Sequence, residues 1–212
     1  MTTTKPWLVR LIRAVGGAMA RCLFAIRIEG AHLVPASGPV LLAGNHSGFV
    51  DGPLVFLLAP RPAALLAKAE IFIAPFNRLF LALGQIPVHR GKPDRTALKS
   101  GLAHLAAGNA LGVFPEGTRG SGAFEEITDG LAYLALRSGA PVVPLAVIGT
   151  AKAWPKGNRP PKFRAPVHIV FGAPVMVTAT GDPRARRTVA DAAEQLRLAL
   201  FEHVQCATRE TA

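Results

Sequence analysis

The segment PVLLAGNHSGFVDGPLVFLL, residues 39–58, predicts a buried strand that passes through a short turn into a helix. Its first six residues form the short apolar run that is typical of a strand inside a sheet. Asp51 followed by Gly52 and Pro53 is typical of a helix start, with the aspartate as N-cap and the proline just inside. We therefore place His46 at the end of the strand and Asp51 at the start of the helix.

The spacing of His46 and Asp51 indicates a turn between them. Neighbours on one face of a helix are three or four positions apart, and these two residues are five apart. In a strand, positions five apart point to opposite faces. The two side chains can therefore meet only if the backbone turns between them.

Short apolar runs alternate with helical patterns along the whole chain. Strands are predicted at residues 23–28, 40–44, 63–67, 85–89, 111–114, 142–148 and 167–171, and helices at residues 52–58, 76–83, 94–107, 130–138 and 188–203. Such alternation predicts a single α/β domain with a central mixed, largely buried sheet flanked by helices. We expect this domain to cover residues 24–212, with residues 155–166 as a loop rather than a linker.

Residues 1–23 are predicted to contain a basic amphipathic helix that docks on a membrane. One side of the helical wheel carries Trp7, Leu8, Leu11, Ile12, Val15, Met19 and Cys22, and the other carries Arg10, Arg13 and Arg21. A helix of this kind can lie in a membrane interface. An ordinary helix packed on the core is the equal alternative, and Gly16 and Gly17 are a weak point in either case.

Composition limits the classes of function. The 212 residues are 50% hydrophobic, enough for one domain with a substantial core. The net charge of +11 implies an acidic partner, which could be nucleic acid, an anionic membrane or a phosphorylated substrate. Cys22 and Cys206 match no metal or redox spacing, so we expect a reducing compartment. No uncharged apolar run reaches the roughly 18 residues of a membrane span.

A histidine with a carboxylate partner is a candidate general base. The carboxylate fixes the imidazole tautomer and stabilises the imidazolium that forms when a proton is taken. Ser47 is adjacent to His46 and badly placed for a nucleophile, so the base would act directly on a substrate hydroxyl. No second histidine lies at ligand spacing, and we expect no metal site. The alternative is a strand-end histidine followed by a plain N-cap.

The segment FPEGTR, residues 114–119, has the composition of a phosphate site. Gly117 lets the backbone turn and expose its amides, while Thr118 and Arg119 add a hydroxyl and a planar guanidinium that can grip phosphate at two points. Glu116 could order Arg119 or bind a substrate hydroxyl. A glycine-containing turn with a solvated arginine is the alternative.

Two further segments carry basic residues after predicted strands. Arg90 ends GQIPVHR, residues 84–90, at a position where α/β folds gather ligands. Lys68 and Glu70 follow the apolar run at residues 63–67. Taken alone, each is weak evidence, because exposed charges at strand ends are common.

In chain order, these motifs resemble the sequence blocks of the lysophosphatidic acid acyltransferases, also called 1-acylglycerol-3-phosphate acyltransferases, within the wider glycerolipid acyltransferase group. NHSGFVD fits the family's NHx4D block, GQIPVHR its second block, and FPEGTR its third block letter for letter. VVPLAVI, residues 142–148, fits the fourth block, and LAKAEIF, residues 66–72, fits a lysine-containing segment. The resemblance covers roughly residues 40–150.

The resemblance implies a role for each matching residue. His46 would deprotonate the acceptor hydroxyl, and Asp51 would orient His46. The acceptor site would be formed by Glu116, Gly117, Thr118 and Arg119, with phosphate neutralised by Arg119, Arg90 and Lys68. Pro144 would be structural. The chain departs from the family after FPEGTR, where Glu125, Glu126 and Asp129 make the rim acidic.

The expected reaction is transfer of a fatty acyl group from acyl-CoA or acyl carrier protein to lysophosphatidate, giving phosphatidate. It needs no cofactor, and the enzyme would sit peripherally on the cytoplasmic face of the cell membrane. The basic stretch at residues 152–164 could meet donor phosphates, an acidic carrier protein or anionic lipid, or could simply be solvated. Glycerol 3-phosphate or another lysolipid is an alternative acceptor. A non-enzymatic module that binds membrane or nucleic acid explains the charge but not the motifs, so nucleic acid is not expected.

Overall fold

The computed structural model describes residues 5–89, 94–117, 124, 127–155, 157, 160–178, 181–182 and 185–211. Within these residues, seven strands form one sheet in the order β1-β7-β6-β2-β5-β3-β4. The strands are β1 (Phe24–Glu29), β2 (Val40–Gly44), β3 (Ala63–Lys68), β4 (Ile86–Val88), β5 (Ala110–Val113), β6 (Val142–Ile148) and β7 (Ala165–Phe171). Each of the seven predicted strands is confirmed, with ends displaced by at most two residues.

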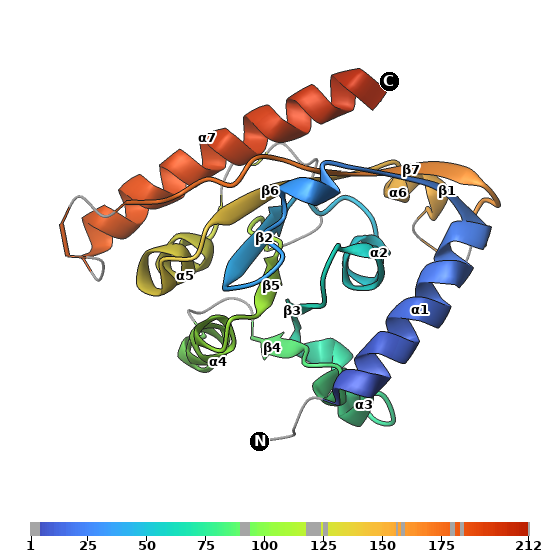
Figure 1. The fold of residues 1–212 in the computed structure, drawn as a ribbon, viewed down its shortest axis with the longest axis horizontal. Helices are drawn as coiled ribbons and strands as arrows, with labels where there is room; N and C mark the ends of the chain where they lie inside the picture. The colour runs from blue at the N-terminus through green and yellow to red at the C-terminus, as the bar shows by residue number, and fades with distance from the viewer. Residues whose placement is uncertain are drawn as a thin grey trace.

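The helices flank this sheet (Figure 1). They are α1 (Pro6–Leu23), α2 (Asp51–Leu58), α3 (Asn77–Ala82), α4 (Arg95–Ala106), α5 (Asp129–Ser138), α6 (Thr150–Ala153) and α7 (Arg186–Thr211), with short 3-10 turns η1 (Ala31–Leu33) and η2 (Ala69–Ile71). The predicted α/β class with a mixed sheet and an N-terminal helix is confirmed. The last helix runs well beyond the predicted end at His203, and α6 was not predicted.

Strand direction places the ends of most strands at one edge of the sheet. β2 pairs in parallel with β5 and β6, and β3 pairs in parallel with β4 and β5. β7 is antiparallel to β6, and β1 is parallel to β7. The carboxyl ends of β2, β3, β5 and β6 therefore share an edge with the amino ends of β7 and β1. We call this the His46 edge, because His46 directly follows β2.

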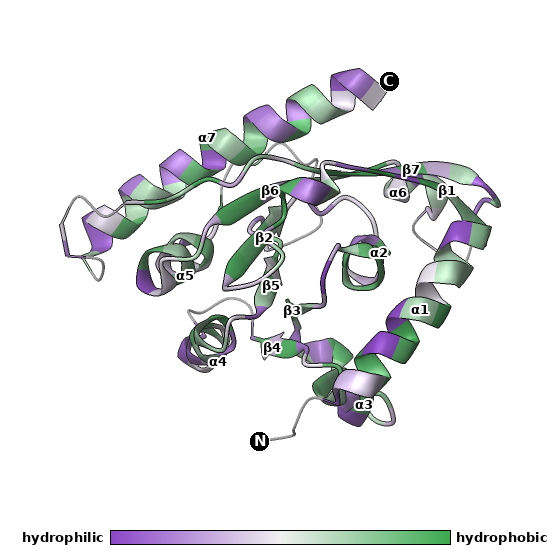
Figure 2. Ribbon diagram, viewed as in Figure 1, coloured by the Kyte–Doolittle hydropathy of each residue, from purple (hydrophilic) through white to green (hydrophobic). Residues whose placement is uncertain are grey.

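Each face of the sheet is covered by its own layer of helices, as Figure 1 shows. Along β2, Leu41 and Ala43 belong to the core under α4, α5 and α7, while Val40 and Leu42 belong to the core under α1 and α2. All five residues of β2 are buried. A strand covered on both faces needs a continuous apolar run, and the green central strands of Figure 2 follow this rule.

Helix α1 packs on α2 through small residues and leaves an apolar stripe exposed. Gly16 is a site of close approach, since a Cβ there would lie 2.7 Å from Cδ2 of Leu57, and the helix continues without a break through the glycine pair. Val9, Gly17 and Ala20 are buried on this side. The large apolar residues of α1 that remain exposed are Trp7, Leu11, Val15 and Met19. One side of α1 thus packs on the core, and docking of its other side on a membrane stays a prediction.

Arg13 lies on the side of α1 opposite the exposed apolar stripe, as the helical wheel placed it, and this side faces α2. Its guanidinium donates to the carbonyl oxygens of Phe56 and Ala59 at the end of α2. Burial lowers the pKa of Arg13 from its ordinary value. These carbonyls have no partner within their own helix, so Arg13 provides the hydrogen bonds that a helix end requires.

None of the helices in the described part of the chain combines the length and the hydropathy that crossing a bilayer requires.

Candidate active site

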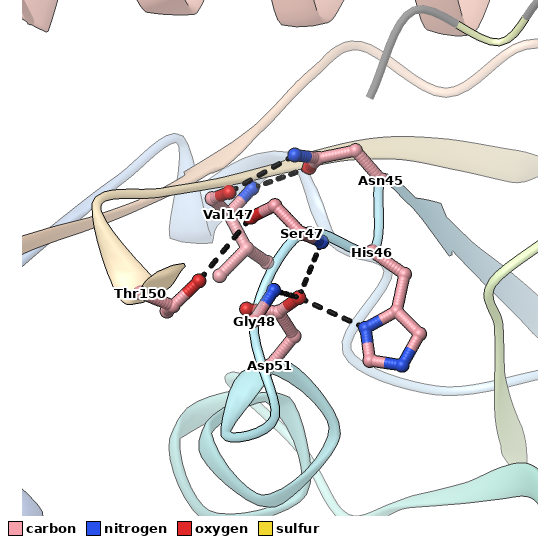
Figure 3. Close-up of polar contacts among 7 residues, drawn as sticks. All are labelled: Asn45, His46, Ser47, Gly48, Asp51, Val147 and Thr150. Atoms are coloured by element: carbon pink, nitrogen blue, oxygen red, sulfur yellow. Dashed lines mark hydrogen bonds and ion pairs between the residues drawn. The ribbon is translucent and has the colours of Figure 1, made fainter. Parts of the chain in front are cut away.

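Asn45 fixes the point at which the chain leaves β2 (Figure 3). Its Nδ2 donates to the carbonyl oxygen of Val147 at 3.0 Å, and its Oδ1 accepts from the amide of Val147 at 2.8 Å. The side chain thus replaces one rung of the β2–β6 ladder where the backbone of β2 turns away. Asn45 was not predicted to belong to the site, although an asparagine directly after a buried apolar strand is a signal for such a contact.

Asp51 organises the turn that follows. The side chain is fully buried. Its Oδ2 accepts from the amides of Ser47 at 2.8 Å and Gly48 at 2.7 Å, and lies 2.9 Å from Nδ1 of His46 (Figure 3). The predicted N-cap role of Asp51 is wrong by one residue, because Val50 is the N-cap of α2. The carboxylate turns back to the loop, where it satisfies two amides and orients the imidazole.

The tautomer of His46 follows from this contact. A carboxylate oxygen can only accept, so Nδ1 of His46 carries the hydrogen and Nε2 presents its lone pair. The ring also stacks on Phe114, with 4.7 Å between ring centroids. His46 is thus held on one edge by Asp51 and on one face by Phe114, which is the arrangement a general base requires.

The opposite side of the turn rests on α6. A Cβ at Gly48 would lie 2.5 Å from Oγ1 of Thr150, so this position has room only for glycine. Thr150 is fully buried, and its Oγ1 lies 3.3 Å from Oγ of Ser47. Thr150, which supports the turn of NHSGFVD, therefore lies directly after the fourth sequence block, VVPLAVI.

A cavity of about 720 Å³ opens at the His46 edge beside this turn. Phe114, which stacks on His46, also lines the cavity. Its walls come from β3, β4, β5, α4, α5 and the first turn of α7, and their apolar side chains include Leu66, Val88, Val113, Leu131 and Val189. A largely apolar cavity next to a positioned base can accept a ligand with a hydrocarbon chain.

The structure brings three of the predicted substrate-binding residues to this cavity. Lys68, Glu116 and Gly117 line it. Lys68 Nζ lies 3.3 Å from Oε1 of Glu70. Gly117 has φ +66, as its predicted turn requires, and its amide donates to the carbonyl oxygen of Phe114 at 3.2 Å. Arg90, Thr118 and Arg119 lie outside the described residues, so their predicted roles stay predictions.

Two charged residues that sequence analysis did not single out also line the cavity. Asp94 is the N-cap of α4, and the amides of His89 and Ala97 donate to its carboxylate and lower its pKa. Arg186 comes from the first turn of α7. Nothing in the local sequence indicates that the C-terminal helix reaches a cavity at the ends of β3 and β5.

No three His, Cys, Asp or Glu side chains in the described ranges come together in a group that could hold a metal ion.

The fold and the site together define a class of protein: an α/β domain with a histidine–aspartate pair between a strand end and a helix start, beside an apolar cavity. Residues 25–148 match the family model described as Acyltransferase, and the chain belongs to that family. This finding confirms the resemblance inferred from the sequence blocks.

Named relatives show which acyltransferases of this family the chain is similar to. Over 169 residues the chain is 30% identical to the 1-acyl-sn-glycerol-3-phosphate acyltransferase of Limnanthes alba, covering 74% of this chain and 60% of that protein. It is 27% identical over 154 residues to the enzyme of the same name from Bacillus subtilis, covering 71% of this chain and 73% of that one. Some relatives are much longer: the match spans 44% of LPAT1, chloroplastic, from Arabidopsis thaliana.

A solved structure has the same fold. The crystal structure of the 1-acyl-sn-glycerophosphate (LPA) acyltransferase PlsC from Thermotoga maritima matches with a TM-score of 0.67 and 25% identity. The match covers 91% of this chain and 79% of that one. The coverage extends beyond the four sequence blocks to most of the chain.

Proposed function

We propose that this protein transfers a fatty acyl group from an acyl thioester to the free hydroxyl of lysophosphatidate, giving phosphatidate. The observation that carries the proposal is the 2.9 Å contact between Nδ1 of His46 and Oδ2 of Asp51 at the border of an apolar cavity. The names of the relatives support the choice of lysophosphatidate as acceptor.

The proposed reaction uses His46 first as a base and then as an acid. Nε2 takes the proton of the acceptor hydroxyl while its oxygen attacks the thioester carbonyl carbon. Asp51 stabilises the imidazolium that results. The tetrahedral intermediate then collapses, the C–S bond breaks, and the imidazolium returns its proton to the departing thiolate. The products are an ester and a free thiol, and no cofactor enters the balance.

The cavity supports a division of the substrate into two parts. Its apolar walls suit an acyl chain, and Lys68 supplies positive charge at the end of β3 for a phosphate. The family resemblance implies that Arg90 and Arg119 join Lys68 in this task. Glu116 and Gly117 also line the cavity, where they would meet the glycerol part of the acceptor.

We also propose that the protein works at a membrane surface, because an acceptor with a long acyl chain stays in the bilayer. The exposed stripe of Trp7, Leu11, Val15 and Met19 on α1 supports this. Apolar residues of this size on one face of a helix with arginines nearby are typical of interfacial docking.

The test is an acceptor panel. The purified protein is given lysophosphatidate, glycerol 3-phosphate or another lysolipid with a series of acyl-CoA donors, and free thiol is measured together with the product ester. The proposal expects the fastest thiol release with lysophosphatidate. Faster thiol release with another acceptor would support the acyltransferase activity but show that lysophosphatidate is not the preferred acceptor. If neither acyl-CoA nor acyl carrier protein donors give thiol release that depends on an acceptor, the proposed acyltransferase activity is refuted.

A further inference from the structure

A basic groove lies between the end of α1 and the beginnings of β1 and β7. It has a volume of about 570 Å³, and its lining residues are Arg21, Ala25, Ile26, Arg27, Arg164, Pro166 and His168. No acidic residue is among these described lining residues, although Nε of Arg27 pairs with Glu29 at 2.9 Å. The groove is separate from the cavity beside His46 and takes no part in the proposed reaction.

Arg164 is fixed in this groove by its backbone. Its amide donates to the carbonyl oxygen of Leu23 at 2.7 Å, and its Nη1 donates to the carbonyl oxygen of Arg21 at 3.0 Å. Its φ of +58 lies in the left-handed region, which is uncommon for residues other than glycine. A non-glycine residue persists there when its surroundings hold it, and such positions cluster at binding sites.

His168 adds a second unusual feature. It lines the groove, and its buried Nδ1 has no hydrogen-bond partner among the described residues. Buried polar atoms without partners are rare in native proteins. A groove with arginines from two distant segments has the chemistry of an anion site.

The direction of the strands places this groove on the His46 edge. β7 is antiparallel to β6, with His168 paired to Ile148, so Arg164 lies beyond the end of β6, as Thr150 does. Large apolar side chains are exposed at the same edge. Phe163, next to Arg164 in the chain, is 75% exposed, and Phe49 in the turn after β2 is 62% exposed.

We propose that this groove binds the phosphate of an anionic phospholipid in the bilayer while Phe163 inserts among the acyl chains. Arginine beside an exposed aromatic residue matches the boundary between headgroups and hydrocarbon. The His46 edge then faces the lipid surface, so an acceptor in the bilayer has a short path to the base. Only this path to the base rests on the proposed function; binding of the phospholipid does not.

The experiment measures binding of the full chain to two kinds of vesicle, phosphatidylcholine alone and phosphatidylcholine mixed with phosphatidylglycerol. In the double variant Arg21→Gln/Arg164→Gln, affinity for the anionic vesicles should fall by about fivefold per arginine, or about 25-fold. The matched control is Arg95→Gln/Arg209→Gln, which removes the same charge from exposed positions outside the groove. The control should lose no more than about threefold through the general field of the protein.

If the two double variants lose the same affinity, net charge explains the loss and the proposed phospholipid site in the groove is refuted. An unchanged affinity of the groove variant would refute it as well. Phe163→Ser should weaken binding to both kinds of vesicle, and no change there would refute the insertion. Thermal unfolding checks each variant. If the double variant unfolds, Arg27→Gln replaces it, because that side chain is 72% exposed.

A loss of binding to acyl carrier protein with unchanged vesicle binding would also overturn the proposal and assign the groove to a protein partner. Binding is measured without turnover, so failure of the proposed acyltransferase reaction would leave this result untouched.

Discussion

The turn after β2 and the exposed face of α1 differ sharply in how the rest of the molecule supports them. Asn45 and Asp51 of the turn are buried, as is Thr150 of α6 beside it, and the hydrogen bonds of Asn45 and Asp51 reach β6 and the loop backbone. On α1, Trp7, Leu11, Val15 and Met19 are exposed and the core leaves them uncovered. Under the proposed function this difference has a physical reason: a base must be held in one geometry, whereas a docking face must stay open to its partner.

The largest expected effect comes from removing the base in the supported turn. His46→Ala should lower kcat by about 10²–10⁴-fold, which is the usual contribution of general acid–base catalysis. Asp51→Asn should also be severe, because it loses the charge that stabilises imidazolium. Steady-state thiol release measures the effect, and thermal unfolding shows whether the variant is folded. A folded His46→Ala protein with normal turnover would refute the mechanism.

The next effect tests whether support of the turn matters as much as its chemistry. Asn45→Ala leaves both backbone groups of Val147 without their partner, which should cost about 2 kcal/mol of unfolding free energy. Because His46 is then less well placed, kcat should fall about tenfold or more while KM for the acyl donor changes little.

Ser138→Ala is the control for Asn45. Ser138 accepts a hydrogen bond from the amide of Ala140 at the far end of α5, away from the His46 edge. This change should lower stability without lowering kcat. If the two variants lose kcat equally, Asn45 has only a structural role.

Two neighbouring residues of α1 test the proposed role of its exposed face. Leu11 is 51% exposed, whereas Ile12 packs against the core under α1 and α2. Leu11→Asp should weaken vesicle binding by about tenfold, since it removes one large apolar side chain from the interface. Ile12→Asp should instead lower the melting temperature. The opposite assignment of the two effects would mean that the exposed stripe is not the docking face.

The smallest effect concerns pH and a residue far from either region. Burial lowers the pKa of His104, whose Nε2 donates to the carbonyl oxygen of Ala110 at 3.1 Å. In the unfolded chain a histidine has a pKa of about 6.5. As the pH falls through that value, the unfolded state takes up a proton before the folded state does, so stability decreases.

Stability from His104 is therefore complete above a pH of about 6.5 and is lost progressively as the pH falls toward the lower folded pKa. Denaturant unfolding at a series of pH values measures this slope. In His104→Gln the free energy of unfolding should depend less on pH, and vesicle binding through α1 should be unchanged. A slope that is identical in the variant would assign the pH dependence to other groups.

Much of the fold follows from local sequence. Strands buried on both faces need unbroken apolar runs, and each of the seven runs became a strand close to its predicted range. Glycine and proline marked the ends of helices, as Gly139 does after α5. The sequence also indicated the His46–Asp51 pair, because two side chains at that spacing can meet only across a turn.

Tertiary structure alone decided what lies far apart in the chain. Asn45 and Val147 are 102 positions apart, and Arg21 and Arg164 are 143 apart, so no local pattern could predict either contact. The helical wheel could not show that Arg13 faces the end of α2, where the last carbonyls need donors. Local sequence sets backbone propensity and burial, while the partners of buried polar groups depend on which elements the fold brings together.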